Sequence, residues 1–175
     1  MDFTSLKEEP VREMLKATAA EVVGCHPLFG PDCPSLAGEN VILCPGRGER
    51  WLKRMEGLFT KGGARVTVAT PADHDRMMAL IQGLTHLDTI LMGLTLRDSG
   101  VEASELDTFS TPVFRTKQAI IERVFDARPE LYAGFIAGNG NMPKILEIYE
   151  NNLSALKRLI LAGDAAGITA LIRKP

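Results

Sequence analysis

The sequence predicts a mainly α-helical chain, with an α/β part over residues 1–70 and an all-α part over residues 71–175. In the first part, short apolar runs that read as strands alternate with amphipathic helical segments, which favours a parallel sheet. From Thr70 onward the apolar residues recur at helical spacing. With 175 residues and 45% apolar content, the chain can build a hydrophobic core.

Three strands and two helices are expected in the first part. Pro10 is tolerated because it falls in the first turn of the first helix, and Gly62 and Gly63 end the second. The opening residues, MDFTSLK, read as the end of a strand entering a loop. The expected helices cover residues 8–18 and 47–61, and the expected strands cover 21–25, 40–44 and 64–70.

The longest predicted helix runs from residue 71 to about Gly100. Thr70 is its expected N-cap, Pro71 takes the first helical position, and Asp73 completes a near capping box. One face is apolar and comprises Met77, Leu80, Ile81, Leu84, Leu87, Leu91 and Leu94. Further helices are expected over residues 112–127, 129–138, 142–163 and 164–174, and such an Ile- and Leu-rich array often forms a dimer core.

The opposite face of the longest helix is small and polar. It carries Asp75, Ala79, Gln82, His86, Thr89 and Gly93. A solvated face would normally carry lysine and glutamate, so this stripe suits a surface that packs near a binding site. The periodicity by itself favours helix–helix packing through small residues, with His86 hydrogen-bonded.

Composition excludes several classes of protein. A net charge of −2 argues against a general nucleic-acid binder, and no apolar run approaches the roughly 18 residues of a membrane span. The acidic, amphipathic N-terminus is unlike a signal peptide, so a cytoplasmic location is expected. Three cysteines without a C-x-x-C pair indicate neither a disulfide framework nor a zinc site.

His26, in the stretch GCHPLFGPD, is the main candidate for chemistry. It follows a predicted strand, at the edge where α/β sheets place ligands, and a neutral imidazole there can accept a proton from a substrate hydroxyl. The alternative is a histidine that only orders the following loop. Cys25 is not expected to act with His26, because adjacent strand residues point to opposite faces.

Other candidates have simple structural explanations when they are taken alone. Ser5 could orient an imidazole and Lys7 could bind an anion, or they could be an N-cap and a solvated lysine. Arg115 suits a carboxylate ligand but could lie on the surface. The acidic cluster at 73–75 is better explained by the helix dipole than by a metal site, and no glycine-rich phosphate loop is recognisable.

Four stretches together resemble prephenate dehydrogenase, in particular the dehydrogenase part of the chorismate mutase–prephenate dehydrogenase type. The resemblance spans residues 2 to about 164. The most specific elements are HPLFGPD and the helix with HD, IQ and a following histidine. The stretches are DFTSLKEEPVREML, VVGCHPLFGPDCPSLAGENVILCPG, ADHDRMMALIQGLTHLDTI and FSTPVFRTKQAIIERVFDARPELYAGFIAGN.

The resemblance implies oxidative decarboxylation of prephenate to 4-hydroxyphenylpyruvate, with NAD or NADP, in tyrosine biosynthesis. His26 would accept the ring hydroxyl proton, and Ser5 would support that histidine. Substrate contacts would come from Arg115, which would grip a carboxylate, and from His86, Lys7 and Gln82. The resemblance also implies a homodimer and the possibility of feedback inhibition by tyrosine. An arogenate dehydrogenase, or a non-catalytic module that dimerises and binds prephenate or tyrosine, is the alternative.

The resemblance also has a gap. Family members open with a strand, a glycine-rich turn and a helix ahead of the S-x-K element, and these are not recognisable in this sequence. We therefore expect a truncated chain: a remnant of a Rossmann-like nucleotide domain over residues 1–70, followed by a helical dimerisation domain over residues 71–175. No metal is expected.

Overall fold

The computed structural model describes residues 1–30, 32–127 and 129–173. Pro31 of the HPLFGPD motif and the end of the predicted C-terminal helix lie outside these residues. The chain forms two compact units, Met1–Gly140 and Asn141–Pro175, and each is described by itself.

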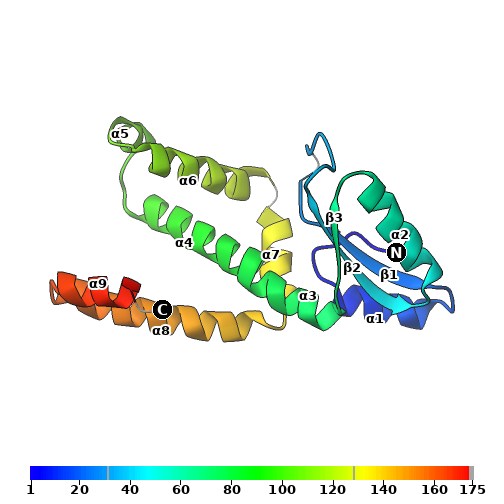
Figure 1. Ribbon diagram of the computed structural model, residues 1–175. Helices are drawn as coiled ribbons and strands as arrows, with labels where there is room; N and C mark the ends of the chain where they lie inside the picture. Colours follow the sequence, from blue (N-terminus) through cyan, green and yellow to red (C-terminus); the bar gives the residue numbers. More distant parts are fainter. Residues whose placement is uncertain (31, 128, 174–175) are drawn as a thin grey trace. The chain divides into compact units, whose positions relative to one another are not determined.

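The N-terminal residues build a three-stranded sheet of order β1-β2-β3 (Figure 1). Along the chain, the elements of this part are α1 (Glu8–Ala17), β1 (Val22–Pro27), β2 (Asn40–Arg47), α2 (Arg50–Lys61) and β3 (Arg65–Val68). The expectation of a wholly parallel sheet is wrong, because β1 pairs antiparallel with β2. Only β2 and β3, which α2 connects, are parallel. The described residues between β1 and β2 form no helix, and parallel neighbours need a crossover of that kind.

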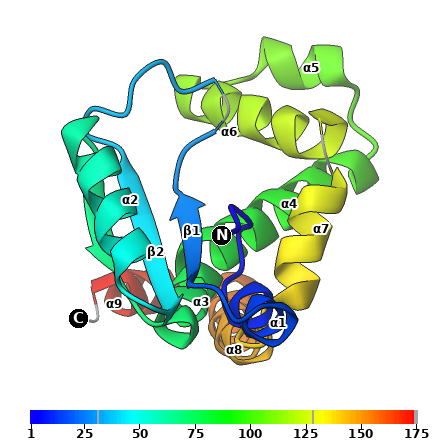
Figure 2. The same ribbon diagram turned by 90° about the vertical axis from the view of Figure 1, so that its right-hand side faces the viewer.

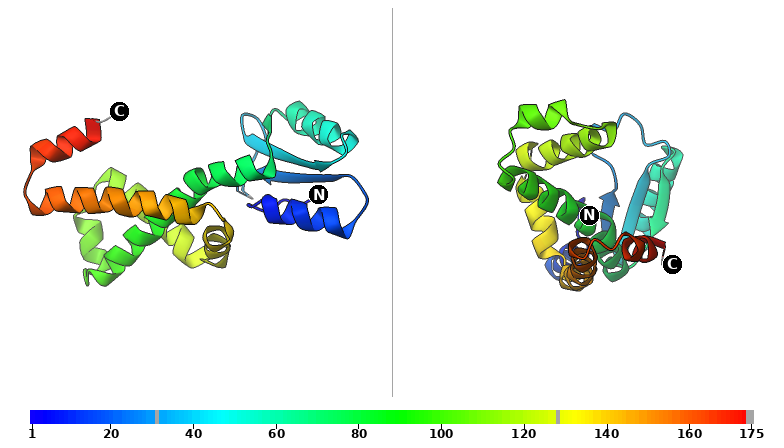
Figure 3. Two further views of the ribbon diagram at one scale, coloured as in Figure 1. Left: turned by 90° about the horizontal axis from the view of Figure 1, so that it is seen from below. Right: turned by 90° about the vertical axis from the view of Figure 1, so that its left-hand side faces the viewer.

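The sheet lies between α1 and α2, as Figures 2 and 3 show. Its α2 side holds the hydrophobic core, in which Cys25 and Leu43 are fully buried against Met55 and Phe59 of α2. His26, the next residue along β1, instead contacts α3. The prediction that Cys25 and His26 do not share a face is therefore confirmed.

The long predicted helix is present and begins as expected. It comprises α3 (Pro71–Met78), the π-helical segment η1 (Ala79–Gly83) and α4 (Leu84–Asp98), which follow one another without a break (Figure 1). The Thr70 hydroxyl accepts a hydrogen bond from the Asp73 amide at 3.0 Å, which confirms the N-cap. The π segment was not predicted; such segments often mark functional sites.

Within the single chain, the apolar face of this helix is largely exposed, and part of its small polar face is buried. Apolar side chains on the predicted apolar face, among them Met77, Leu80, Ile81 and Leu91, are exposed within the single chain. On the small polar stripe, Ala79 and Gly93 are buried. A Cβ atom at Gly93 would lie 2.6 Å from the ring of Phe125. Because glycine has no side chain, α4 can pack closely against the segment that carries Phe125.

The remaining elements of the described chain are helical. They are α5 (Ala103–Thr108), α6 (Pro112–Glu122), the π-helical segment η2 (Arg123–Ala127) and α7 (Pro129–Gly138) in the first unit, and α8 (Met142–Leu161) and α9 (Ala165–Arg173) in the second. The sequence did not predict α5. Within the second unit, α8 and α9 form a helical hairpin whose turn contains Gly163 at φ +64° (Figure 3).

The continuous helix Pro71–Asp98 is long and apolar enough to cross a membrane by length and composition. This finding differs from the sequence expectation. It is weak evidence for a membrane span, because core helices of proteins outside membranes meet the same criterion.

Lys7 is a structural residue in this fold. Its side chain is completely buried, and its ammonium pairs with Asp2 and donates to the Cys25 carbonyl oxygen at 3.0 Å. It also lies 3.3 Å from the Thr4 hydroxyl. The burial of this ammonium contradicts the alternative of a solvated lysine, and a substrate contact by Lys7 stays a prediction.

Replacing Gly93 with alanine should destabilise the protein. Alanine favours a helix by about 1 kcal/mol over glycine, but the added methyl group would overlap the Phe125 ring. We expect the free energy of unfolding to fall by about 1–2 kcal/mol, measured by denaturant titration. Gly57→Ala is the matched control, because nothing lies within 4 Å of its Cβ position in α2 and the same change should stabilise there. Equal stabilisation by both changes would contradict the packing.

Replacing Lys7 with methionine should leave the Asp2 carboxylate without its partner. We expect the free energy of unfolding to fall by roughly 3–5 kcal/mol, and Asp2→Asn in the same chain to restore part of it. Lys16→Met, at an exposed pair with Glu13, should leave the unfolding midpoint nearly unchanged. A Lys7→Met chain of normal stability would show that the buried pair does not hold α1 to the sheet.

Candidate functional site

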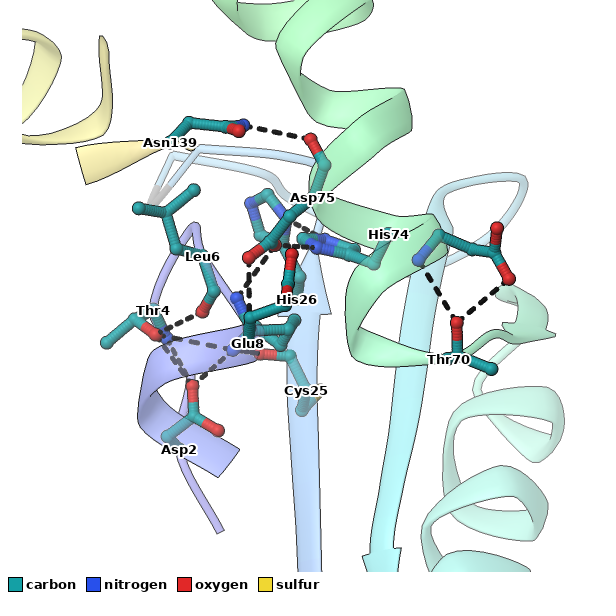
Figure 4. A network of polar contacts seen from close by, with 12 residues as sticks. Asp2, Thr4, Leu6, Glu8, Cys25, His26, Thr70, His74, Asp75 and Asn139 are labelled. Carbon is teal, nitrogen blue, oxygen red and sulfur yellow. Dashed lines mark hydrogen bonds and ion pairs between the residues drawn. The ribbon is translucent and has the colours of Figure 1, made fainter. Parts of the chain in front are cut away.

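His26 sits near the end of β1 and is only 4% exposed. Its Nδ1 atom lies 2.8 Å from Nε2 of His74, a residue of α3 (Figure 4). The two rings meet edge to face, with centroids 5.0 Å apart. His26 is therefore fixed by a histidine from the long helix, which the sequence analysis had not connected with it.

Asp75 extends this contact into a chain of three residues. The Nδ1 atom of His74 lies 2.7 Å from Oδ1 of Asp75. The carboxylate also accepts from the backbone amides of Lys7, at 2.8 Å, and Glu8, at 2.9 Å. It thereby satisfies two of the free amides that begin α1, where no side chain of the helix itself serves as the cap.

Hydrogen bonds keep the Asp75 side chain ionised, and a further one holds its backbone. Burial alone would raise the pKa of Asp75, but hydrogen bonds from His74 and from the Glu8 and Lys7 amides lower it below its ordinary value. The Asn139 amide, at the end of α7, donates to the Asp75 carbonyl oxygen at 2.9 Å. Asp75 is thus an ionised acceptor, held by α1, α3 and the end of α7.

This arrangement is compatible with a tautomer in which Nε2 of His26 can act as a base. An ionised Asp75 only accepts hydrogen bonds, so Nδ1 of His74 carries the proton. Where Nε2 of His74 carries no proton, it accepts from Nδ1 of His26. In that tautomer, Nε2 of His26 is left with the free lone pair.

His26 is held neutral. Burial, followed by the nearby His74 and Lys7, lowers the pKa of His26 to about 4, against an opposing effect of Asp75 and Asp2. An imidazole in this state is unprotonated throughout the physiological range and can accept a proton from a bound hydroxyl.

His26 lines a cleft of about 420 Å³. Four of the six predicted site residues lie around it, namely His26, Ser5, Gln82 and His86. The other lining residues are mainly apolar or aromatic: Phe3, Pro27, Leu28, Phe29, Gly30, Arg123, Leu131, Tyr132 and Phe135. Such a lining, with a few polar groups among apolar ones, is typical of a small-molecule site.

Arg123, rather than Arg115, is the arginine of this cleft. It comes from η2, and its guanidinium lies 3.2 Å from the position of a Cβ atom at Gly30. Arg115 is not a lining residue of the cleft; its guanidinium donates to the carbonyl and hydroxyl oxygens of Ser110, each at 3.2 Å. The sequence analysis missed Arg123, and nothing in its helical surroundings distinguishes it from a surface arginine.

The long helix supplies the opposite wall of the cleft. Gln82 comes from η1, and His86 from the next turn stacks edge to face on Tyr132, with centroids 4.7 Å apart. Burial lowers the pKa of His86, so this ring too favours its neutral form. Both π-helical segments therefore contribute a polar side chain, Gln82 or Arg123, to the same cleft.

Other chemistries find less support. Burial raises the pKa of Cys25 to about 11, so its thiol is a poor nucleophile at neutral pH. Among the residues that the structure describes, no three histidine, cysteine or acidic side chains are grouped as metal ligands.

The described residues do not fit the pyrophosphate of a dinucleotide. The strand-to-helix turn most similar to a phosphate loop joins β2 to α2 and contains Gly48, after Gly46 near the end of β2. The start of α2 is already taken by Glu21, whose carboxylate accepts from the Trp51 amide at 2.9 Å. A phosphate there would meet a negative charge, so we assign no cofactor contact to any residue.

Two family models match nearly the whole chain. The nucleotide-binding domain of prephenate dehydrogenase matches residues 1–68, and the prephenate dehydrogenase dimerisation domain matches residues 70–174. The junction lies at the start of the long helix.

Individual proteins agree with the family models. A probable arogenate/prephenate dehydrogenase of Methanocaldococcus jannaschii is 32% identical over 179 residues, covering 99% of this chain and 40% of that protein. The T-protein of Enterobacter agglomerans is 32% identical over 170 residues, covering 97% and 46%. The chain thus spans less than half the length of these relatives.

Solved structures show the same fold. Synechocystis arogenate dehydrogenase matches with a TM-score of 0.74 and 21% identity, over 98% of this chain and 65% of that one. Aquifex aeolicus prephenate dehydrogenase in complex with hydroxyphenyl propionate and NAD⁺ matches with a TM-score of 0.69 and 23% identity, over 95% and 61%. The chain belongs to the prephenate dehydrogenase family.

Proposed function

We propose that this chain carries the substrate side of a prephenate dehydrogenase, which converts prephenate to 4-hydroxyphenylpyruvate and carbon dioxide. The observation that carries the proposal is a buried His26 of lowered pKa, held by His74 and Asp75, on a cleft that Arg123 also lines. The family models and the relatives support the reaction.

His26 would act on the ring hydroxyl of prephenate. As the hydroxyl-bearing carbon is oxidised, its oxygen becomes a carbonyl and releases its proton to Nε2 of His26. Departure of the ring carboxyl group as carbon dioxide then makes the ring aromatic, and His26 returns the proton to the phenolate oxygen. A base with a low pKa suffices, because a hydroxyl on a carbon losing hydride becomes strongly acidic.

The Asp75 carboxylate would favour the protonated form of His26, while the nearby His74 opposes it. When Nε2 of His26 takes a proton, the positive charge lies 2.8 Å from His74, which in turn contacts an ionised carboxylate. Ser5, on the same cleft, would orient the ring hydroxyl toward His26. The contact with His74 would also hold the imidazole ring in one orientation.

Arg123 would bind a carboxylate of the substrate. It lies on the cleft, whereas Arg115 does not, so we move the role implied by the resemblance from Arg115 to Arg123. Gln82 and His86 would contribute further hydrogen bonds, and the aromatic side chains would pack against the ring.

We propose NAD or NADP as the hydride acceptor, supported by the nucleotide-binding family model and the NAD⁺ complex of the Aquifex aeolicus structure. We also propose a homodimer. A match to a dimerisation domain supports it, as do exposed apolar side chains on α3, η1 and α4, which a second copy would cover. A non-catalytic binding module is the alternative, favoured by the lack of a fit to a pyrophosphate group among the described residues.

The proposal predicts separate effects for His26 and Arg123. Prephenate binding to the purified chain is measured by calorimetry, and turnover is followed as the reduction of NAD or NADP. We expect Arg123→Ala to weaken binding at least tenfold, about 1.4 kcal/mol, because a carboxylate loses its cation. His26→Asn should leave binding within about threefold but lower turnover at least about a hundredfold.

Arg115→Ala serves as the matched control, because it removes an arginine that does not line the cleft. It should change binding less than about threefold. Equal losses for Arg115→Ala and Arg123→Ala would contradict the assignment of Arg123. No binding of prephenate would contradict the proposed function, and binding without any turnover would favour the non-catalytic module.

A further inference from the structure

The charges around the cleft are of one sign. Arg123 is its cationic side chain, and His26 and His86 are neutral because burial lowers the pKa of each. The remaining polar lining residues, Ser5, Gln82 and Tyr132, are uncharged. Among the described residues that line the cleft, none is an aspartate or a glutamate.

This matters for the two substrates on which members of the family act. Prephenate and arogenate share the ring, its hydroxyl group and two carboxylates, and differ only in the side chain. There, prephenate has a keto group, whereas arogenate has an ammonium group. A keto oxygen needs only a hydrogen-bond donor, but an ammonium group taken out of water needs acceptors, and a carboxylate serves it best.

Carboxylates of several neighbouring segments are not lining residues of the cleft. Both oxygens of Asp75 are taken, by His74 and by the backbone amides of Lys7 and Glu8. Glu9 and Glu130 line a neighbouring hollow of about 390 Å³ and are not lining residues of this cleft. Asp32, two residues beyond Gly30, is also exposed and is not a lining residue.

Gln82 is the side chain whose chemistry would decide between the two. It comes from η1, on the helix that carries both Asp75 and His86, and it lines the cleft with His26 and Arg123. Its amide can donate to a keto or carboxylate oxygen. A glutamate of the same size could only accept, and would suit an ammonium group.

We infer that this cleft selects a keto acid over the corresponding amino acid, prephenate over arogenate, and that the uncharged Gln82 is a determinant of that choice. The inference rests on the proposed function, and it specifies the class of substrate that the cleft of that function binds. Discrimination arises because the amino acid would leave its ammonium group poorly partnered beside Arg123. Inhibition by tyrosine at this cleft would then require a high tyrosine concentration.

The test uses two stable compounds that differ in the same way, 4-hydroxyphenylpyruvate and L-tyrosine. Their binding to the full chain is measured by calorimetry, for the unaltered protein and for Gln82→Glu. We expect the keto acid to bind at least tenfold more tightly than tyrosine. Gln82→Glu should reduce that ratio at least tenfold, by weakening the keto acid and strengthening tyrosine. Gln118→Glu makes the same change of charge on α6, outside the cleft, and should leave the ratio unchanged.

The possible results show whether the proposed function, the selectivity for keto acids or the role of Gln82 is wrong. If neither compound binds, the proposed function fails. If tyrosine binds as tightly as the keto acid, the function stands and the selectivity is wrong. If Glu130→Gln then abolishes tyrosine binding, the neighbouring hollow supplies the ammonium site. A ratio that Gln82→Glu leaves unchanged, in a chain that keeps its unfolding midpoint, would remove Gln82 as a determinant.

Discussion

The buried Asp75 carboxylate is the contact on which the fold and the site both depend. It lies in the first turns of the long helix, yet it accepts hydrogen bonds from the two amides that begin α1 and from His74. Because it caps α1, it ties the long helix to the α/β part. Because it fixes the proton of His74, it also sets the orientation of His26 at the end of β1.

The same contact explains how a buried histidine can serve as a base. Removal from water and the proximity of His74 lower the pKa of His26, and the tautomer with its proton on Nδ1 leaves Nε2 free to accept one. A surface histidine would be partly protonated near neutral pH and free to rotate. The two π-helical segments place Gln82 and Arg123 around the base, so the cleft takes its polar groups from irregular turns of otherwise regular helices.

Local patterns predicted most of the elements but few of the contacts between them. Strand positions, the Thr70 cap and the long helix follow from periodicity and capping chemistry. The antiparallel β1–β2 pair could have been inferred, since no helical pattern separates those strands. The role of His74 could not, because its partner lies 48 residues away and a histidine in a first helical turn has a simpler explanation. Asp75 already lay on the polar stripe, which was the one available signal.

The two arginines also show that sequence patterns did not predict contacts between elements. Arg115 and Arg123 both occur in one predicted helix, and only the packing of η2 against the loop after β1 brings Arg123 to the cleft. Lys7 was assigned to the substrate by resemblance, whereas its ammonium pairs with Asp2 inside the fold. A sequence motif identifies residues that matter, but their contacts show whether they matter for binding or for folding.

The most direct measurement is a titration of His26 by nitrogen-15 NMR of the histidine side chains in the full chain, with His26→Asn used to assign its signals. The account predicts a pKa near 4 and, at pH 7, a neutral ring protonated on Nδ1. A His26 that titrates at or above its ordinary value of 6.5, or that carries its proton on Nε2, would contradict the His26–His74–Asp75 arrangement and the base assigned to it.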